Sequence, residues 1–301
     1  MTPHEQQFLD ALASAPDTAS VARSVETLLA AGGPRSPGFP AAMAEALYMH
    51  LRAVSTHPAF RAWLDVYFGR RRAAFRAPGQ RPNFLYYPPL APQAWFDTGE
   101  LPELAPLQGG IAAVRDELLG LLAEAPGFVP YVEKAAERDG RWRGLADSLQ
   151  WSARHLVRRG LWDDALKARL PVTAAFLAEA PLAHYPPHAP EAFVSRLLPG
   201  TELPPHHGLS NIKLTAHLPV DLPPGCGIVV DGETRTWQAG DFLVFDDSFL
   251  HSAWNRGEHP RTVLIMDIWH PGLDAEERRA LGHAIAVLDQ VRACTATQRD
   301  S

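Results

Sequence analysis

The chain has 301 residues, 46% of them hydrophobic and 21% charged, which describes a globular protein of one large domain or two ordinary ones. Its net charge of −6 does not indicate a positively charged surface for nucleic acid, and no apolar run approaches the roughly 18 residues of a membrane span. We therefore expect neither nucleic acid nor a membrane as a partner. Cys226 and Cys294 are too few for a disulfide framework or a thiolate metal site. The start of the chain lacks a basic segment followed by an apolar one, so no secretory signal is expected and the predicted location is cytoplasmic.

Helical spacing of apolar residues dominates the start of the chain. Two short helices are predicted within residues 3–31, separated by the break at Pro16-Asp17-Thr18, and two more at 40–54 and 58–75. We therefore expect a helical N-terminal region over residues 1–80, which either packs on a sheet or contacts a protein partner.

The composition changes at residues 80–92, where Pro82-Asn83-Phe84-Leu85-Tyr86-Tyr87-Pro88-Pro89 brings prolines and aromatic residues together. We expect a domain boundary here, with a second domain over residues 81–301. A helix is predicted from about Gly109 to Glu124, because apolar residues recur on one face. Residues 150–170 have the pattern of a basic amphipathic helix or a loop.

From residue 193 onward, short apolar runs alternate with clusters of Pro, Gly, Asn and Asp at intervals of roughly 8 to 12 residues, which is typical of a β-sandwich or barrel. Asp231-Gly232 is predicted to form a hairpin turn between two strands. A C-terminal helix, with Asp274 as its N-cap, is predicted to extend to about Val291 and to cover the sheet. The predicted strands are residues 193–198, 212–218, 227–230, 234–237, 242–245 and 262–269.

Two histidines lie at the ends of predicted strands, His206 just before one and His251 just after another. Because they are far apart in the sequence, only a folded sheet could bring them together. Imidazole is a ligand for Fe, Zn, Cu and Ni, and two histidines plus one carboxylate are typical of non-haem Fe(II) oxygenases. Such sites usually have an aspartate two residues after the first histidine, where this chain has Gly208.

Four segments around these histidines form a set: Pro205-His206-His207-Gly208-Leu209-Ser210-Asn211, Glu233-Thr234-Arg235-Thr236-Trp237, Phe245-Asp246-Asp247-Ser248-Phe249-Leu250-His251-Ser252-Ala253-Trp254 and Asp267-Ile268-Trp269-His270-Pro271. Together they resemble the catalytic domain of the aspartyl/asparaginyl β-hydroxylases, which are 2-oxoglutarate- and Fe(II)-dependent dioxygenases. The resemblance implies a mixed α+β fold, in which the N-terminal helical region is followed by a double-stranded β-helix (jelly-roll, cupin-like) catalytic domain with flanking helices. In family members that lack the carboxylate ligand, glycine replaces it and water fills the position, which Gly208 matches.

The resemblance implies that the metal is Fe(II) and that His206 and His251 are its ligands and the catalytic residues. His207 should point to the opposite face, because neighbouring side chains of a strand alternate. Asp246 and Asp247 lie shortly before His251 and could be proposed as the missing carboxylate. The family motif keeps both without using them as ligands, so we expect them to act in the turn and in hydrogen bonds.

The resemblance also implies binding of 2-oxoglutarate and O2. Arg261 would hold the distal carboxylate, since a planar guanidinium binds a carboxylate through two parallel hydrogen bonds, and Ser195 would donate its hydroxyl to the same group. His217 would contact the other end of the cosubstrate. Well-known family members have an arginine two residues before this histidine. Here the position is Thr215, and Lys213 on the same strand face could supply the charge.

Further residues are expected to contact the substrate or to support the site from behind. Trp142 lies near a segment that is similar to a Trp-rich strand of the family, although a tryptophan is more often a core residue. The complete set of these expected residues is Trp142, Asn211, Arg235 and Trp254.

The implied reaction is hydroxylation of an unactivated C–H bond, and the resemblance favours β-hydroxylation of Asp or Asn residues in a peptide or protein. The same family includes enzymes that hydroxylate lipid A acyl chains and free amino acids. A free amino acid, a small metabolite or a lipid acyl chain is therefore the alternative substrate. The competing functions are a non-catalytic ligand-binding domain of the same fold and a cupin-type Zn or Ni enzyme that uses no keto acid.

Overall fold

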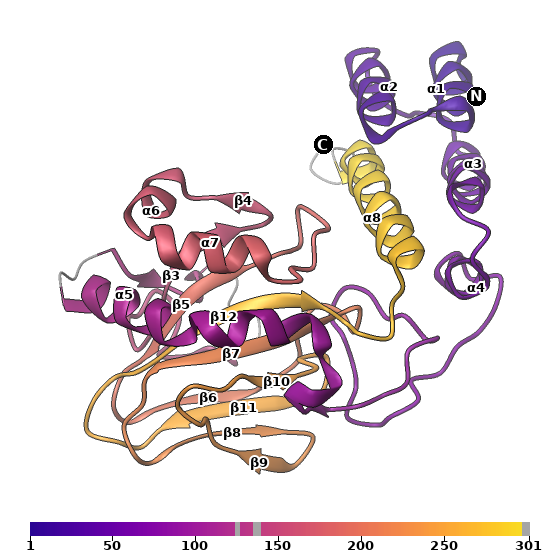
Figure 1. Ribbon diagram of the computed structural model, residues 1–301. Helices are drawn as coiled ribbons and strands as arrows, with labels where there is room; N and C mark the ends of the chain where they lie inside the picture. The colour runs from indigo at the N-terminus through magenta and orange to yellow at the C-terminus, as the bar shows by residue number, and fades with distance from the viewer. Residues whose placement is uncertain (124–126, 135–139, 297–301) are drawn as a thin grey trace. The chain divides into compact units, whose positions relative to one another are not determined.

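The computed structural model describes residues 1–123, 127–134 and 140–296, with side chains described as far as residue 292 (Figure 1). The chain forms two compact units. The helical unit contains Met1–Ala74, Tyr185–Pro187 and the C-terminal segment from Leu273, and the sheet unit contains Phe75–His184 and His188–Gly272. None of the helices in these described residues combines the length and the apolar character that crossing a membrane requires.

The helices of the helical unit are α1 (Pro3–Ser14), α2 (Thr18–Ala30), α3 (Phe39–Val54), α4 (Pro58–Tyr67) and α8 (Ala275–Ala296). Helix α1 packs on α2 and α3, and α8 packs on α2, α3 and α4. The four predicted N-terminal helices are confirmed. However, α4 ends at Tyr67 instead of near residue 75, because Gly69 has a positive φ of 70° that does not continue a helix.

The C-terminal helix α8 begins as predicted but packs on different elements. The backbone N–H of Glu277 donates to Asp274 Oδ1 over 2.8 Å, so Asp274 is the N-cap. The predicted second domain, residues 81–301, includes this helix as a cover for the sheet. In the structure α8 belongs to the helical unit, because it packs on the N-terminal helices, and the units divide between Ala74 and Phe75.

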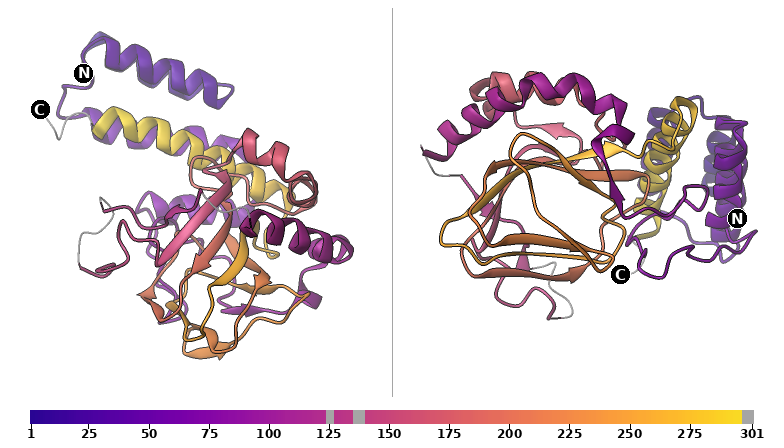
Figure 2. Two further views of the ribbon diagram at one scale, coloured as in Figure 1. Left: turned by 90° about the vertical axis from the view of Figure 1, so that its left-hand side faces the viewer. Right: turned by 60° about the horizontal axis from the view of Figure 1, so that its bottom comes forward.

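The sheet unit contains two antiparallel sheets that face each other (Figure 2). The larger sheet has, in spatial order, β1 (Trp95–Phe96), β10 (Leu243–Phe245), β7 (Lys213–Asp221), β12 (Arg261–Trp269), β5 (Ala192–Leu197), β3 (Trp151–Arg158) and β2 (Val129–Pro130), with β4 (Leu161–Trp162) paired to β3. The smaller sheet has β6 (Thr201–His206), β11 (His251–Asn255), β8 (Cys226–Val230) and β9 (Glu233–Arg235). One apolar cluster between the sheets includes Phe193 and Val263 from the larger sheet and Ile228 and Ala253 from the smaller. The predicted mixed α+β fold with a cupin-like β-sandwich is therefore confirmed.

The outer face of the larger sheet is covered by helices. These helices are α5 (Ile111–Ala123) and α7 (Pro171–Glu179), flanked by α6 (Asp164–Arg169) and the 3-10 segments η1 (Thr98–Glu100) and η2 (Pro102–Gly110). In β7, Leu214 and Ala216 belong to this outer cluster, so Lys213, Thr215 and His217 face the smaller sheet, as the alternation predicts. Helix α5 matches the helix predicted over 109–124, whose last predicted residue lies outside the described residues.

Residues 150–170, predicted to be a helix or a loop, form β3, β4 and α6 instead. Trp151 and Ala153 belong to the cluster between the sheets, but the register of β3 against β5 shifts between His155 and Val157. This irregularity interrupts the period-two pattern by which a strand is recognised in a sequence.

Both histidines of interest lie on strands. His206 is the last residue of β6 and His251 is the first of β11, whereas the prediction placed His206 before a strand and His251 after one. Pro204 and Pro205 make a strand at this position difficult to predict from the sequence, because proline is disfavoured within strands. They are tolerated because β6 is an edge strand of the smaller sheet, where a missing N–H costs no ladder hydrogen bond.

Candidate active site

The rings of His206 and His251 lie side by side. Their Cα positions pair directly across β6 and β11, and their ring centroids are 4.1 Å apart. Each Nδ1 contacts a backbone carbonyl of its own segment, His206 with Pro204 at 2.8 Å and His251 with Phe249 at 2.9 Å. A carbonyl oxygen only accepts, so each Nδ1 carries the proton and each Nε2 keeps its lone pair.

Burial keeps both rings neutral. It lowers the pKa of His206 to about 3, with a further contribution from the neighbouring His251, and it is also the first cause of the lowered pKa of His251. A neutral imidazole whose Nδ1–H is held by a carbonyl is the form that binds a metal ion through Nε2. His207 does not join the pair, because its ring makes a hydrogen bond with the backbone of Gly79.

The space beside Gly208 is filled by a carboxylate from another segment. A Cβ built on Gly208 would overlap the carboxylate of Asp247, and the backbone N–H of Gly208 donates to the carbonyl of Asp247 at 2.6 Å. Across the residues that the structure describes, no set of three His, Cys, Asp or Glu ligand atoms lying within 4.8 Å of one another includes His206 or His251. Among the residues that the structure describes, the carboxylate of Asp247 lies nearby, but neither it nor any other is grouped with both histidines as a third ligand.

Lys213 holds Asp247 in this position. Its Nζ donates to Asp247 Oδ2 and to Asp267 Oδ1, each at 2.8 Å, and to Thr215 Oγ1 at 3.3 Å. Burial opposes the ionisation of Asp247, but the Lys213 ammonium outweighs it and holds the pKa of Asp247 below its ordinary value. An ammonium has three N–H donors, so this arrangement differs from the expectation that Lys213 contacts the cosubstrate.

Asp246 acts in the turn before β11. Its carboxylate accepts from the backbone N–H of Ser248 at 2.9 Å and from Gln80 Nε2 at 2.8 Å. Burial raises the pKa of Asp246 to about 7. These contacts are of the kind expected for Asp246, in the turn and in hydrogen bonds.

Arg261 is buried with an incompletely paired guanidinium. Only 2% of the residue is exposed, and its Nε and Nη1 have no hydrogen-bond partner in the described parts of the chain. Burial lowers the pKa of Arg261 to about 10, so the side chain remains positively charged at neutral pH. Its Cζ lies 5.0 Å from the ring centroid of Trp237. A buried cation with unused donors is suited to hold a carboxylate that enters from solution.

Ser195 lies on β5, the strand next to β12 that carries Arg261. It is fully buried, and its Oγ accepts a hydrogen bond from Trp151 Nε1 at 3.3 Å. The contact leaves the hydroxyl proton of Ser195 to be donated to a ligand. Trp151 thereby orients the residue that was expected to contact the distal carboxylate.

His217 has the opposite tautomer from the metal-binding candidates. Trp237 Nε1 donates to its Nδ1 at 3.1 Å, so the proton of the neutral ring is on Nε2. Burial, followed by the charge of Arg261, holds the pKa of His217 well below its ordinary value. His217 is therefore a neutral hydrogen-bond donor, fixed in orientation by the same tryptophan that contacts Arg261.

Aromatic side chains stand beside His206. Trp142 makes an edge contact with its ring at a centroid distance of 5.0 Å, and Trp151 lies 6.2 Å from it. Tyr131 stacks on Trp151 at 4.0 Å. The structure thus places Trp142 next to the histidine pair, where a substrate contact was expected.

The other three expected site residues lie elsewhere. The side chain of Asn211 exchanges two hydrogen bonds with the backbone of Tyr87, at 2.7 and 3.0 Å, and so anchors the segment that precedes β1. Arg235 donates to Glu233 at 2.7 Å on the smaller sheet. Trp254 points away from the histidine pair, because alternation along β11 puts it on the other face.

The structure adds Trp151, Trp237 and Asp267 to the expected residues. Trp237 and Asp267 stand within the motifs, and for Asp267 the alternation of its strand is a signal that could have identified its direction. Trp151 begins a strand that the sequence pattern does not reveal, so no comparable signal exists for it.

Gly208→Ala is expected to destabilise the protein by about 1–3 kcal/mol, because the new Cβ must displace the carboxylate of Asp247 from Lys213. Equilibrium urea unfolding measures the change. Gly99→Ala is the matched control in the same unit, since a Cβ at Gly99 meets no heavy atom within 4 Å, and it should change the unfolding free energy by less than about 0.5 kcal/mol. Equal losses in the two variants would contradict the close packing of Asp247 against Gly208.

Comparison with known proteins identifies relatives of this chain. The sequence model of the Aspartyl/Asparaginyl beta-hydroxylase family matches residues 109–271. Aspartyl/asparaginyl beta-hydroxylase of Homo sapiens is 30% identical over 243 residues, which are 78% of this chain and 30% of that protein. Aspartate beta-hydroxylase domain-containing protein 2 of Mus musculus is 45% identical over 98 residues, 32% of this chain and 29% of that protein. The chain thus spans about 30% of the length of these curated relatives.

Among solved structures, the Cupin_2 domain of an XRE family transcriptional regulator from Enterobacter cloacae is 15% identical, with a TM-score of 0.27 over 40% of this chain and 98% of that chain.

The family match covers more than half of the chain, and it includes His206, His251, Ser195 and Arg261. The chain therefore belongs to the aspartyl/asparaginyl β-hydroxylase family.

Proposed function

We propose that the protein is a hydroxylase that uses Fe(II), 2-oxoglutarate and O2 to hydroxylate an unactivated C–H bond. One observation carries the proposal: His206 and His251 present neutral rings with unprotonated Nε2 atoms, in a sheet unit that also contains the buried, incompletely paired Arg261. Imidazole nitrogen is a suitable ligand for Fe(II), and two protein ligands leave coordination positions for a keto acid, O2 and water. The residues present fit this ion.

The residues divide the work between them. His206 and His251 would hold the ion through Nε2, oriented by the carbonyls of Pro204 and Phe249. When bound, Fe(II) supplies the activation of O2 that is coupled to oxidative decarboxylation of 2-oxoglutarate to succinate and CO2. The carboxylate of Asp247 occupies the space that a side chain at position 208 would fill.

The cosubstrate would be held by charge and by oriented donors. Arg261 would pair with the distal carboxylate, and Ser195, oriented by Trp151, would donate to the same group. His217 would donate through Nε2–H to the other end of the keto acid, because its Nδ1 accepts from Trp237. Burial of these groups excludes water and strengthens each of these contacts.

The favoured substrate is an Asp or Asn residue of a peptide or protein, hydroxylated at the β-carbon. The names of the relatives support this choice, and the aromatic rings beside His206 offer an apolar surface for a peptide. A free amino acid, a small metabolite or a lipid acyl chain is the alternative. We also propose that the N-terminal helices contact a protein partner.

The test is an aerobic incubation of the full chain with Fe(II), 2-oxoglutarate and a panel of peptides that contain Asp or Asn. We expect succinate by NMR and a mass gain of one oxygen atom on a peptide, and neither product from His251→Ala. Peptides with the target residue replaced by Ala are the matched substrate control. If no succinate forms, and 2-oxoglutarate with Fe(II) also fails to raise the melting temperature, a binding domain or a keto-acid-independent cupin enzyme would be the better assignment.

A further inference from the structure

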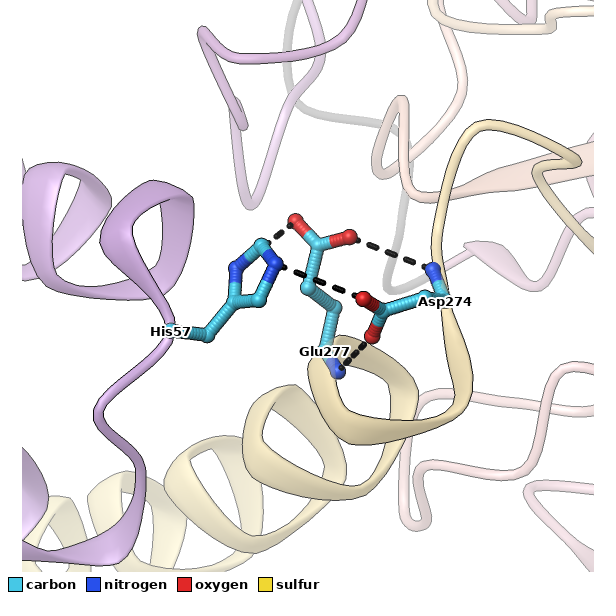
Figure 3. Close-up of side chains that lie close together, drawn as sticks. All are labelled: His57, Asp274 and Glu277. Atoms are coloured by element: carbon cyan, nitrogen blue, oxygen red, sulfur yellow. Dashed lines mark hydrogen bonds and ion pairs between the residues drawn. The ribbon is translucent and has the colours of Figure 1, made fainter.

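A second group of metal-ligand side chains lies in the helical unit, at the start of α8 (Figure 3). His57 Nε2 lies 3.3 Å from Asp274 Oδ2, and His57 Nδ1 lies 3.6 Å from Glu277 Oε1. One ligand atom from each of the three residues lies within 4.8 Å of the other two. In the portion of the chain that the structure describes, this is the one group of three His, Cys, Asp or Glu residues that meets this criterion.

The capping of α8 fixes the direction of both carboxylates. Asp274 Oδ1 accepts from the backbone N–H of Glu277 at 2.8 Å, and Glu277 Oε2 accepts from the backbone N–H of Asp274 at 3.1 Å. Each carboxylate uses one oxygen in this reciprocal pair. The other oxygens, Asp274 Oδ2 and Glu277 Oε1, are the ones that lie next to His57, as Figure 3 shows.

The segment that carries His57 is also held in place. The backbone N–H of His57 donates to Ser55 Oγ at 2.9 Å, and that hydroxyl donates to Glu276 Oε1 at 2.5 Å. Arg61 Nε donates to the carbonyl of Ser55 at 3.1 Å. The imidazole is therefore attached to the first turn of α8 through its neighbours as well as through its own ring. Such supporting contacts hold ligands in the geometry that a metal ion needs.

The negative charge of the two carboxylates favours the binding of a cation. With a neutral imidazole, Asp274 and Glu277 together carry two negative charges; the side chain of Glu277 is 7% exposed and that of Asp274 is 57% exposed. His57 Nδ1 is buried and makes no hydrogen bond in the described residues. Two close carboxylates repel each other, and nearby positive charge relieves that repulsion. The charge of Arg278 and the partial positive charge at the start of α8 supply part of it, and a bound cation would supply more.

We propose that His57, Asp274 and Glu277 bind a divalent transition-metal ion, of which Zn²⁺ is the best match. Zn²⁺ takes imidazole and carboxylate ligands at about 2.0–2.2 Å, and in a tetrahedral site such ligand atoms lie about 3.3–3.6 Å apart. The 3.3 Å between His57 Nε2 and Asp274 Oδ2 has this spacing. Three protein ligands leave the fourth position to water. The ion ties the segment before α4 to the first turn of α8.

The test is zinc content per chain of the full-length protein, stripped with a chelator and then dialysed against Zn²⁺. His57→Gln should bind one ion fewer than wild type. Asp274→Asn and Glu277→Gln should each weaken binding at this site about tenfold or more. Both preserve the reciprocal caps, because Asn is a good N-cap and Gln replaces Glu in the capping box. Asp17→Asn, the N-cap of α2, is the matched control and should bind as wild type does.

The count separates this site from the proposed Fe(II) site. If His206 and His251 bound no metal, wild type would hold one zinc ion and His57→Gln none, which supports the inference. Equal zinc in wild type, His57→Gln and Glu277→Gln would overturn it and leave His57 as a side chain that only contacts the two carboxylates. Circular dichroism identifies any variant that has not folded. If one variant fails to fold, the zinc content of a folded one, Asp274→Asn or Glu277→Gln, decides whether the site binds zinc.

Discussion

Replacing His206 or His251 by Ala is expected to remove both turnover and bound iron, whereas His207→Ala is expected to keep most of the iron. The first two side chains are the pair with unprotonated Nε2 atoms, and His207 is hydrogen-bonded to Gly79 instead. Loss of a supporting residue behind a metal ligand costs about 10- to 100-fold in affinity. If His206 and His251 are the two protein ligands, loss of either one should cost more.

Iron per chain, measured after anaerobic loading and desalting, gives the answer directly. Asp246→Asn and Asp247→Asn are the informative controls, since they test whether a nearby carboxylate is a ligand. Both should retain iron, because Asp246 accepts from Ser248 and Gln80 and Asp247 is paired with Lys213. Loss of iron from His207→Ala alone would mean that the register assigned to β6 is displaced by one residue.

The motifs and strand alternation made much of the sheet unit predictable. In β7 the apolar residues Leu214 and Ala216 alternate with Lys213 and His217, and the two sets face opposite sides of the sheet as expected. The Asp231-Gly232 hairpin follows from local turn chemistry, and both residues have positive φ values of 50° and 82°. These features depend on neighbours in the sequence, which is why a sequence can reveal them.

Features that depend on distant partners were not predictable. Lys213 was a reasonable candidate for the cosubstrate, but its ammonium lies between Asp247 and Asp267, which only the folded sheet brings together. Helix α8 shows the same distinction. Its cap at Asp274 is local and was predicted, whereas its packing on the N-terminal helices is a tertiary choice among apolar surfaces and was not.

Irregular strands were the other source of error. Trp151 orients Ser195, but it lies on β3, whose alternation is broken by the register shift between His155 and Val157. The prolines at the end of β6 concealed the strand that carries His206. In both places a local rule for strands is broken in the part of the sheet that forms the candidate site, so the sequence pattern does not reveal these strands.

Arg261→Leu is expected to have opposite effects on the free protein and on cosubstrate binding. In the free protein Arg261 is a buried cation whose Nε and Nη1 have no partner among the described residues, and burying such a group is costly. Leucine is apolar and removes that cost, so the melting temperature of the ligand-free variant should equal or exceed that of wild type. Binding of 2-oxoglutarate should weaken, because a hydrogen bond to a charged group contributes about 1.5–3 kcal/mol.

That loss corresponds to an increase of about 10- to 150-fold in the Michaelis constant for 2-oxoglutarate. Two measurements check it: succinate formation as a function of 2-oxoglutarate, and the rise in melting temperature that 2-oxoglutarate causes, which the variant should lose. Ser195→Ala is the graded comparison. It removes one hydroxyl donor and the acceptor for Trp151 Nε1, so its effect on the Michaelis constant should be smaller, about 1 kcal/mol or fivefold. An unchanged Michaelis constant in Arg261→Leu would reject Arg261 as the carboxylate-binding residue. A large fall in the melting temperature of its ligand-free form would show instead that the guanidinium is needed to hold the sheets together.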